Sequence, residues 1–369
     1  MQETFTEDQS QFREVVRKFL GDQSPMTAVR ELQETESGFD AKVWQSLGQN
    51  LGLPGTHLPE AYGGLGFGPI ELGIILEEMG RSLYCGPFLS SAVMAGYAVS
   101  LFADEASRQA LIPELSSGDL RATLVLDSLD RPEQVGKTLA VDTTNHLTGR
   151  AEIVIDGLTA NELFVMAESP EGLGLYQVSP GAEGVNLQAR ESIDLTRKLS
   201  RVVFDHTPVQ RLGRVDPAGL QRFWNLACVA LSHEMIGGAE ALLESTVEYT
   251  KIRVQFGRPI GSFQALKHRC ADLLMSLEFA KAATYQAAFG LAVDNGPSFS
   301  ANMAKAMASD CVMETARAGI QLRGGLGFTW EDDTHLYFKR AKCDEVLLGL
   351  PHVHRERMIQ QMEDSDRAA

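Results

Sequence analysis

The sequence predicts an α+β protein in three parts: an N-terminal helical domain over residues 1–120, a β-domain over 121–215 and a C-terminal four-helix bundle over 216–369. Two changes in hydrophobic period support this prediction. Apolar residues recur at helical spacing up to about residue 120, short runs of β-branched and aliphatic residues follow, and helical spacing returns near residue 216. We expect the bundle to mediate oligomerisation.

Helix ends are recognisable in the first part. Thr6 and Gln9 form a capping-box pattern before the first apolar stripe. Asp40 is a candidate cap for a second helix. Asp104 begins a further helix, which we expect to stop before Pro113 because proline lacks an amide donor.

The middle and last parts are divided by their turn residues. Gly, Pro, Asn and Asp separate the runs that we predict as strands. These strands are Thr123–Leu126, Thr138–Val141, Glu152–Ile155, Leu163–Met166, Leu175–Val178 and Arg201–Phe204. The predicted bundle helices are Leu220–Tyr249, Phe263–Phe289, Ser298–Leu322 and Asp344–Gln361.

Composition excludes several classes of protein. The formal charge of −16 argues against nucleic acid or an anionic membrane as partner, since both favour a basic surface. No apolar run approaches the roughly 20 residues of a membrane span, and the N-terminus does not read as a signal peptide. The five cysteines are scattered without a CxxC pair, so we expect buried thiols in a reducing cytoplasm and no metal site.

The stretch Arg253–Asp272 joins two long predicted helices. Gly257, Pro259 and Gly261 favour a turn, and Ser262 is a plausible N-cap for the second helix. An arginine, an amide side chain and an aromatic ring lie within four residues before the turn. Together these groups can hold an anionic aromatic ligand such as a dinucleotide. An ordinary helix–turn–helix with an exposed arginine explains the pattern equally well.

Three blocks of the sequence resemble motifs of the acyl-CoA dehydrogenase family. They keep the order and spacing of the family's motifs, and the resemblance extends from about residue 6 to residue 360. They are Arg253-x-Gln255-Phe256-Gly257-x-x-Ile260-x-x-Phe263-Gln264, then Gln321-Leu322-Arg323-Gly324-Gly325-Leu326-Gly327-Phe328-Thr329-Trp330-Glu331, and, nearer the front, Leu58-Pro59-Glu60-Ala61-Tyr62-Gly63-Gly64-Leu65-Gly66 with Leu76-Glu77-Glu78-Met79-Gly80. The resemblance implies FAD as cofactor, an acyl-CoA substrate and α,β-dehydrogenation, in which a carboxylate takes the Cα proton and the flavin accepts a hydride from Cβ. The implied cofactor-binding residues are Arg253, Gln255, Phe256, Gln264, Gln321, Gly324 and Gly325.

The base that the resemblance requires is missing. The family's usual glutamate position is held by Leu348, and the alternative position on the long helix is held by Ala227. Neither side chain can abstract a proton, so the catalytic residue is unknown. Glu234 and Glu345 are possible substitutes, although each is more simply explained as an ordinary carboxylate.

Residues that line the family's own flavin cleft are also replaced. The loop after the first strand reads Leu126-Asp127-Ser128-Leu129-Asp130-Arg131 instead of the family's Thr-Glu-Pro-x-x-Gly-Ser-Asp pattern. Ile153 and Ile155 stand where a tryptophan and a hydroxyl residue are expected, while Asp156-Gly157 keeps the register.

Three further features have open interpretations. Gly237 and Gly238, inside the long helix, indicate close approach of an acyl chain or of a neighbouring helix. His352 and His354 are two residues apart on a predicted helix and therefore face different directions, which disfavours a metal site. The basic run at 339–342 could meet phosphates or form a solvated helix face.

The replaced and retained motifs sort in a regular way. In the family each flavin is bound by two chains, and the replaced elements are those that one chain uses for its own cleft. The retained elements are those that reach into a neighbour's cleft. The resemblance therefore implies a base-lacking subunit of an α2β2 assembly with a homologous catalytic chain. The Gly327–Glu331 and His335–Tyr337 segments resemble members that act on steroid side-chain CoA esters. A self-sufficient homo-oligomer with a non-standard base, and a flavin monooxygenase or oxidase on the same fold, remain alternatives.

Overall fold

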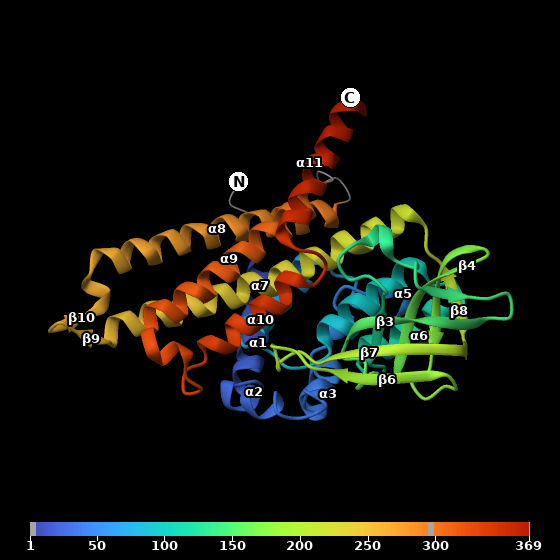
Figure 1. Ribbon diagram of the computed structural model, residues 1–369, viewed down its shortest axis with the longest axis horizontal. Coiled ribbons are helices and arrows are strands. Elements are labelled where there is room, and N and C mark those ends of the chain that lie inside the picture. Colours follow the sequence, from blue (N-terminus) through green and yellow to red (C-terminus); the bar gives the residue numbers. More distant parts are fainter. Residues whose placement is uncertain (1–4, 294–298, 369) are drawn as a thin grey trace. The chain divides into compact units, whose positions relative to one another are not determined.

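The computed structural model describes residues 5–293 and 299–368 (Figure 1). Its contacts divide the chain into two compact units, which we describe separately. The bundle unit comprises Met1–Arg30, Gly73–Tyr84 and Cys228–Ala369, and the sheet unit comprises Glu31–Leu72 and Cys85–Ala227. The predicted order of helices, strands and helices is confirmed, whereas the exact domain boundaries stay a prediction.

Long helices form the bundle unit. Three of them, α2, α4 and α7, are shared with the sheet unit. The bounds of the complete helices are α1 Glu7–Gln23, α2 Met26–Leu32, α4 Pro69–Arg81, α7 Pro217–Ile252, α8 Gln264–Ala292, α9 Ser300–Arg323, α10 Thr334–Val346 and α11 Pro351–Ala368. The capping box at the start of α1 is present, because the Thr6 side chain accepts from the Gln9 amide and the Gln9 side chain accepts from the Thr6 amide. Helix α7 is long and apolar enough to cross a membrane. However, 89% of its apolar 18-residue stretch is buried inside the protein, as in a core helix.

Glycines bring α4 and α7 into backbone contact. A Cβ atom on Gly80 would lie 1.9 Å from the Glu234 carbonyl oxygen, and one on Gly237 would lie 2.0 Å from the Glu77 carbonyl oxygen. Both distances are far below van der Waals contact, so only glycine permits this approach. Of the two readings of Gly237 in the sequence, the structure therefore supports the neighbouring helix.

The sheet unit contains short helices and an eight-stranded mixed sheet. Its helices are α3 Ala41–Gln49, the π-helix Phe88–Ala95 (η3), α5 Gly96–Phe102 and α6 Glu105–Ser117. The strands are β1 Ala122–Val125, β2 Leu139–Val141, β3 His146–Ile155, β4 Glu162–Ser169, β5 Gly172–Val178, β6 Val185–Arg190, β7 Leu199–Pro208 and β8 Gln210–Arg214. Their order is β6-β7-β3-β2-β4-β5-β8, with β1 paired to β4.

Two expectations for this unit require correction. Helix α6 is capped by Asp104 as predicted, but it continues through Pro113 to Ser117. Pro113 is exposed, so water can satisfy the carbonyl that loses its amide partner, while Leu111, Ile112 and Leu115 bury the other face. The sequence also missed β6 and β8, which are the two edge strands of the sheet.

Candidate functional site

A short hairpin projects from the junction of α7 and α8 (Figure 1). Strands β9 Val254–Gln255 and β10 Arg258–Pro259 pair around Phe256 and Gly257, whose φ angles are 55° and 76°. A two-residue turn with both φ values positive is a type I′ turn, which matches the twist of a hairpin. Phenylalanine rarely adopts this conformation, so the turn holds Phe256 under local backbone strain.

The hairpin presents its side chains to solvent. Phe256 is 89% exposed, and Arg253 and Gln255 are exposed as well. The base of the hairpin is supported by Phe263, whose ring meets the Phe256 ring edge-on with centroids 6.0 Å apart. We call the segment Arg253–Gln264 the arm.

The expected N-cap of α8 is wrong. Ser262 belongs to a 3₁₀ turn, Ile260–Ser262, and α8 begins at Gln264 with Phe263 in the cap position and no side-chain cap bond. The Ser262 hydroxyl is buried and does not bond the helix amides. The turn instead displaces the start of α8 by one residue beyond the predicted position.

The second of the blocks that resemble the family forms a turn at the C-terminus of α9. Gly324 has φ 63° and ψ −139°, a combination that is open only to glycine. Arg323, directly before it, is buried and donates to Thr246 Oγ1 at 2.6 Å and to Ser245 Oγ at 2.8 Å. The Arg323 Nε atom also lies 3.1 Å from an Asp332 carboxylate oxygen. Arg323 thereby fastens the glycine turn to the same end of α7 from which the arm extends.

All seven predicted cofactor-binding residues are exposed and lie on these two segments. They are Arg253, Gln255, Phe256, Gln264, Gln321, Gly324 and Gly325. The structure therefore brings the arm and the glycine turn to one end of the α7–α9 pair. Their guanidinium, amide and ring groups suit the phosphates, ribose and ring system of a dinucleotide that approaches from outside this unit.

The two positions at which the resemblance places the base are buried, in contrast to the predicted cofactor-binding residues. Ala227 in the sheet unit is 0% exposed and Leu348 in the bundle unit is 2% exposed. Leu348 and Gly349 have φ angles of 61° and 108°, which make a sharp turn after α10. The His354 ring, through Nε2, donates to the Leu348 carbonyl oxygen at 2.9 Å.

A buried lysine holds the same turn from the other side. Lys305 on α9 is 0% exposed, and its Nζ donates to the carbonyl oxygens of Asp344 at 3.1 Å and Gly349 at 3.2 Å. It also approaches the Glu345 carbonyl at 3.4 Å and donates to Ser309 Oγ at 3.1 Å. Burial lowers the pKa of Lys305 to about 8, so the ammonium form still prevails at neutral pH. These bonds close the C-terminus of α10, where carbonyl groups attract a cation.

The possible substitute bases are both engaged in ion pairs. Glu234 is buried, and its Oε1 lies 2.6 Å from Arg340 Nη1. Glu345 pairs with Lys342. Lys339 stacks over the Trp330 ring, with Nζ 4.4 Å from the centroid. The basic run at 339–342 is thus occupied by contacts within the bundle unit.

In the sheet unit, the replaced loop is closed upon itself. Asp127 accepts the Gly136 amide at 2.8 Å and the Thr138 amide at 2.6 Å. Ile155 is 4% exposed and offers neither a hydroxyl nor an aromatic ring, while Ile153 is 41% exposed. These residues do not fit a flavin, because the loop's carboxylate is used internally and the strand residues are aliphatic.

Sequence reasoning missed a buried polar network in the bundle unit. The Glu77 carboxylate lies 2.9 Å from His233 Nδ1 and 2.7 Å from Arg13 Nη2, and Arg13 also donates to the Tyr285 hydroxyl at 2.7 Å. Burial opposes ionisation of Glu77, but the His233 hydrogen bond and the Arg13 charge lower its pKa. The network ties α1, α4, α7 and α8 together. Its only sequence signal is the Leu76–Gly80 block, since the partners come from three distant helices.

The chain matches known proteins over nearly its whole length. Residues 6–119 match the acyl-CoA dehydrogenase N-terminal domain and residues 221–363 match the acyl-CoA dehydrogenase C-terminal domain. Acyl-CoA dehydrogenase IpdE2 of Mycobacterium tuberculosis is 33% identical over 97% of this chain and 98% of its own length. The solved ChsE4–ChsE5 complex from Mycobacterium tuberculosis contains a chain with a TM-score of 0.89 and 28% identity, covering 98% of this chain and 99% of that one.

A second assembly gives a similar result. A variant of the Tcur3481–Tcur3483 steroid ACAD contains a chain with a TM-score of 0.88 and 27% identity, covering 98% of this chain and 99% of that one. The order of a helical part, a sheet and a second helical part agrees with these matches. This chain belongs to the acyl-CoA dehydrogenase family of FAD-dependent oxidoreductases.

Proposed function

We propose that this chain is the base-lacking subunit of a heteromeric acyl-CoA dehydrogenase and completes the FAD site of a homologous catalytic chain. One observation carries the proposal. The cofactor-binding residues that the sequence retains are all exposed, whereas Ala227 and Leu348, which replace the base, are apolar and buried. Random substitution after loss of function would not be expected to spare the exposed cofactor-binding residues while replacing the residues of the chain's own cleft.

The retained groups supply part of a flavin site and no more. Arg253 would hold a phosphate of FAD, the Phe256 ring would cover a flat face of the cofactor, and the Gln321 amide with the Gly324–Gly325 backbone would meet its polar edge. Bound FAD supplies the hydride acceptor of the reaction. The proton acceptor and the enclosing cleft must come from the partner chain, because the Asp127 loop and Ile155 of this chain offer neither.

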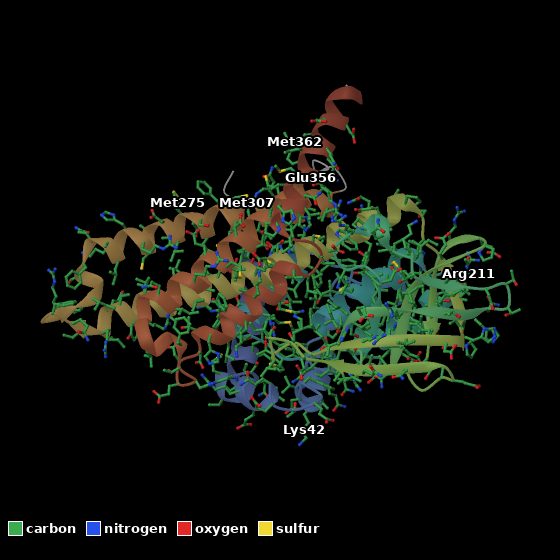
Figure 2. The ribbon with its side chains drawn as sticks, viewed as in Figure 1. Lys42, Arg211, Met275, Met307, Glu356 and Met362 are labelled. Atoms are coloured by element: carbon green, nitrogen blue, oxygen red, sulfur yellow. The ribbon has the colours of Figure 1, made fainter. Side chains whose placement is uncertain are left out.

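The bundle unit also carries an exposed apolar face suited to assembly. Met275, Phe279 and Phe289 lie on one side of α8 and are 57%, 58% and 46% exposed, and Met362 on α11 is 44% exposed. Figure 2 labels Met275 and Met362 among the side chains of these helices. Exposed apolar faces of this kind are typical of protein–protein contacts. We infer an α2β2 assembly in the cytoplasm with one FAD per heterodimer, in line with the heteromeric ChsE4–ChsE5 complex.

A bulky acyl-CoA, such as a steroid side-chain thioester, is the proposed substrate class. Support comes from the Gly327–Glu331 segment and from the similarity to the Tcur3481–Tcur3483 steroid ACAD. The active assembly should prefer branched or ring-bearing acyl-CoA esters. A preference for straight chains in a direct competition assay would contradict this assignment.

The test is to co-express this chain with its homologous partner and to measure flavin per heterodimer. Arg253→Ala should weaken FAD retention in the assembly, because one charge-assisted contact to a phosphate contributes roughly 1.5–3 kcal/mol. Lys251→Ala is the matched control: it removes an exposed cation two residues away, whose ion-pair partner is Glu248 on the same helix. FAD retention in this control should equal that of the wild type.

Purification of this chain alone separates the alternatives. A colourless protein supports the proposal. A homo-oligomer that holds one FAD per subunit and oxidises an acyl-CoA unaided overturns it and favours the self-sufficient enzyme. A yellow protein that consumes oxygen favours a monooxygenase or oxidase.

A further inference from the structure

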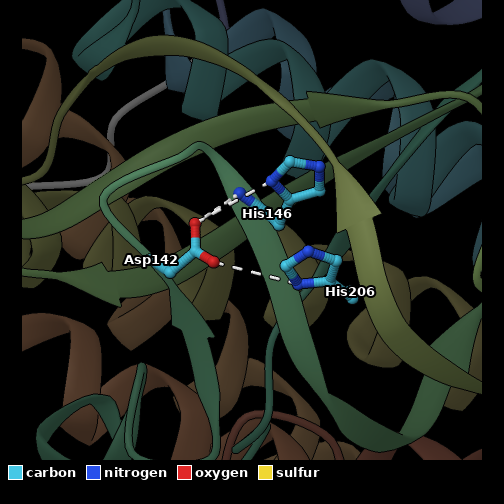
Figure 3. A group of neighbouring side chains, drawn as sticks. All are labelled: Asp142, His146 and His206. Carbon is cyan, nitrogen blue, oxygen red and sulfur yellow. Dashed lines mark hydrogen bonds and ion pairs between the residues drawn. The ribbon is translucent and has the colours of Figure 1, made fainter.

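A cluster of two histidines and one aspartate lies at one end of the sheet (Figure 3). Asp142 follows β2, His146 begins β3 and His206 lies on β7, which pairs antiparallel with β3. Asp142 and His146 flank one turn and are close in the sequence, whereas His206 is brought to them by the pairing of β7 with β3. Within the described residues, no other group of three or more potential ligands converges in this way.

The backbone directs the three side chains toward one another. Asp142 Oδ1 accepts the amides of Thr144 at 2.8 Å and His146 at 3.0 Å, which fixes the β2–β3 turn and leaves Oδ2 on the side of His206. The β3–β7 register shifts between Leu147 and Gly149, so that β7 carries one extra residue. His206 lies in this bulge with φ 52°, and bulges commonly redirect a side chain.

The distances suit a single small cation after a limited movement. Nδ1 of His146 lies 3.9 Å from Asp142 Oδ1, and Nδ1 of His206 lies 3.8 Å from Asp142 Oδ2. The three potential ligand atoms all lie within 4.8 Å of one another. A zinc ion binds nitrogen and oxygen at about 2.0–2.2 Å, so any two of its ligands are at most about 4.3 Å apart.

That movement requires one hydrogen bond to break, because the Thr144 hydroxyl lies 3.0 Å from His146 Nδ1. The two imidazole rings are stacked, with centroids 4.1 Å apart and 8° between their planes. They must tilt apart before both nitrogens can aim at one ion. The His146 and His206 side chains are 31% and 66% exposed, so no core packing opposes the tilt. The Asp142 carboxylate is already held in place by the backbone amides of Thr144 and His146.

We propose that Asp142, His146 and His206 bind one divalent transition ion of the zinc class. Two imidazoles and one carboxylate suit zinc, cobalt, nickel or copper, whereas calcium and magnesium require more oxygen ligands. The bound ion joins the β2–β3 turn to β7 and stiffens this end of the sheet. It is separate from the flavin chemistry, since none of its ligands belongs to the arm, the glycine turn or the base positions.

The test uses the full-length chain without a histidine tag. Zinc is titrated against a chromophoric chelator, and stoichiometry is measured by atomic emission after dialysis. The wild type should hold one zinc per chain. His146→Gln and His206→Asn should each weaken zinc binding by roughly tenfold or more, because each removes one of three ligands. Asparagine is chosen at position 206 because it tolerates a positive φ, which protects the fold.

A control and a second readout decide the result. His352→Gln removes an exposed histidine on α11 and should leave zinc binding unchanged. Cobalt substituted into the wild type should give visible absorption bands that disappear in the His206→Asn variant, while circular dichroism shows both proteins folded. Absence of stoichiometric zinc in the wild type overturns the proposal. Equal zinc affinity in the wild type and the two histidine variants also overturns it.

Discussion

The arm and the turn at Leu348 are both tight turns at the end of a bundle helix, each with a non-glycine residue of positive φ before a glycine, but they differ in burial. At the arm, Phe256 has φ 55° and is 89% exposed. At the other turn, Leu348 has φ 61° and is 2% exposed. One strained residue faces solvent with a side chain suited to a ligand, and the other is buried and held by hydrogen bonds. Strain that persists on an exposed surface is commonly associated with function, whereas strain inside a packed turn is compensated by its neighbours.

The difference predicts that substitutions at the two turns separate stability from cofactor binding. Changes around Leu348 should lower the free energy of unfolding. Changes in the arm should leave folding almost intact and weaken FAD retention in the assembly. Four predictions follow this contrast from the largest expected effect to the smallest.

Lys305→Met should have the largest effect on stability. The substitution leaves the carbonyl oxygens of Asp344 and Gly349 without their buried donor, and each such loss costs about 1–3 kcal/mol. We expect a loss of about 3–5 kcal/mol in urea denaturation, which also includes repacking of the neighbouring side chains. Lys251→Met, at an exposed site beside the arm, should change stability by less than about 0.5 kcal/mol. Equal stability of the two variants would remove the distinction between the turns.

Leu348→Glu restores a carboxylate at the family's base position and should still give no dehydrogenase activity in this chain. The side chain is buried, so an unpaired carboxyl group should destabilise the bundle by about 3 kcal/mol or more. Leu348→Met keeps the volume and should cost less than about 1.5 kcal/mol. Thermal melts of both variants and an acyl-CoA oxidation assay check the prediction. Turnover by the Leu348→Glu chain alone would show that its own cleft is intact.

His354 should make the Leu348 turn sensitive to acid. Burial lowers the pKa of His354 to about 3, well below the value of about 6.5 in an unfolded chain. Between these values the unfolded chain binds the extra proton and the folded chain does not, so stability falls as pH decreases from about 6.5 toward 3. At pH 5 the expected loss from this group is about 2 kcal/mol.

A matched variant isolates that contribution. His354→Gln keeps a donor for the Leu348 carbonyl and cannot be protonated, so the difference in stability between the wild type and this variant should narrow from pH 7 to pH 5. Urea titrations at both pH values give the comparison. A difference that is independent of pH would show that His354 is not neutral in the folded protein.

The sequence predicts those features that depend on neighbouring residues. Thr6 and Gln9 cap α1 three residues apart, and Asp40 and Asp104 cap their helices in the same local way. The missed strands β6 and β8 are edge strands with largely exposed residues, so they lack the apolar run that identifies a strand. The predicted end of α6 before Pro113 was wrong because burial of one face of the helix compensates for the hydrogen bond that proline removes.

The candidate site was predictable to the extent that it consists of contiguous motifs. The arm and the glycine turn each occupy one segment, so the sequence alone was enough to propose their residues as cofactor-binding. The cradle of Lys305 and the pairing of Glu234 with Arg340 join residues 39 to 106 positions apart. The Asp142, His146 and His206 cluster depends on strand register and on a bulge in β7. The sequence separation between the partners in these contacts follows no fixed pattern, so a single sequence does not reveal them.

The smallest effect on folding is expected at Phe256, where two variants separate the ring from the backbone. Phe256→Ala removes the ring and keeps a Cβ atom in the left-handed conformation, whereas Phe256→Gly removes both. A non-glycine residue in the left-handed conformation lowers the stability of the folded state by about 1–2 kcal/mol. Glycine avoids this penalty, but it loses about 0.5–1 kcal/mol of stability relative to alanine because its unfolded state has more conformational entropy. Phe256→Gly should therefore be more stable than Phe256→Ala by at most about 1.5 kcal/mol in thermal melts. If the ring covers the cofactor, both variants should lose FAD from the assembly to the same extent. Retention of FAD in both would mean that Phe256 does not touch the cofactor, and would leave Arg253 as the main contact of the arm.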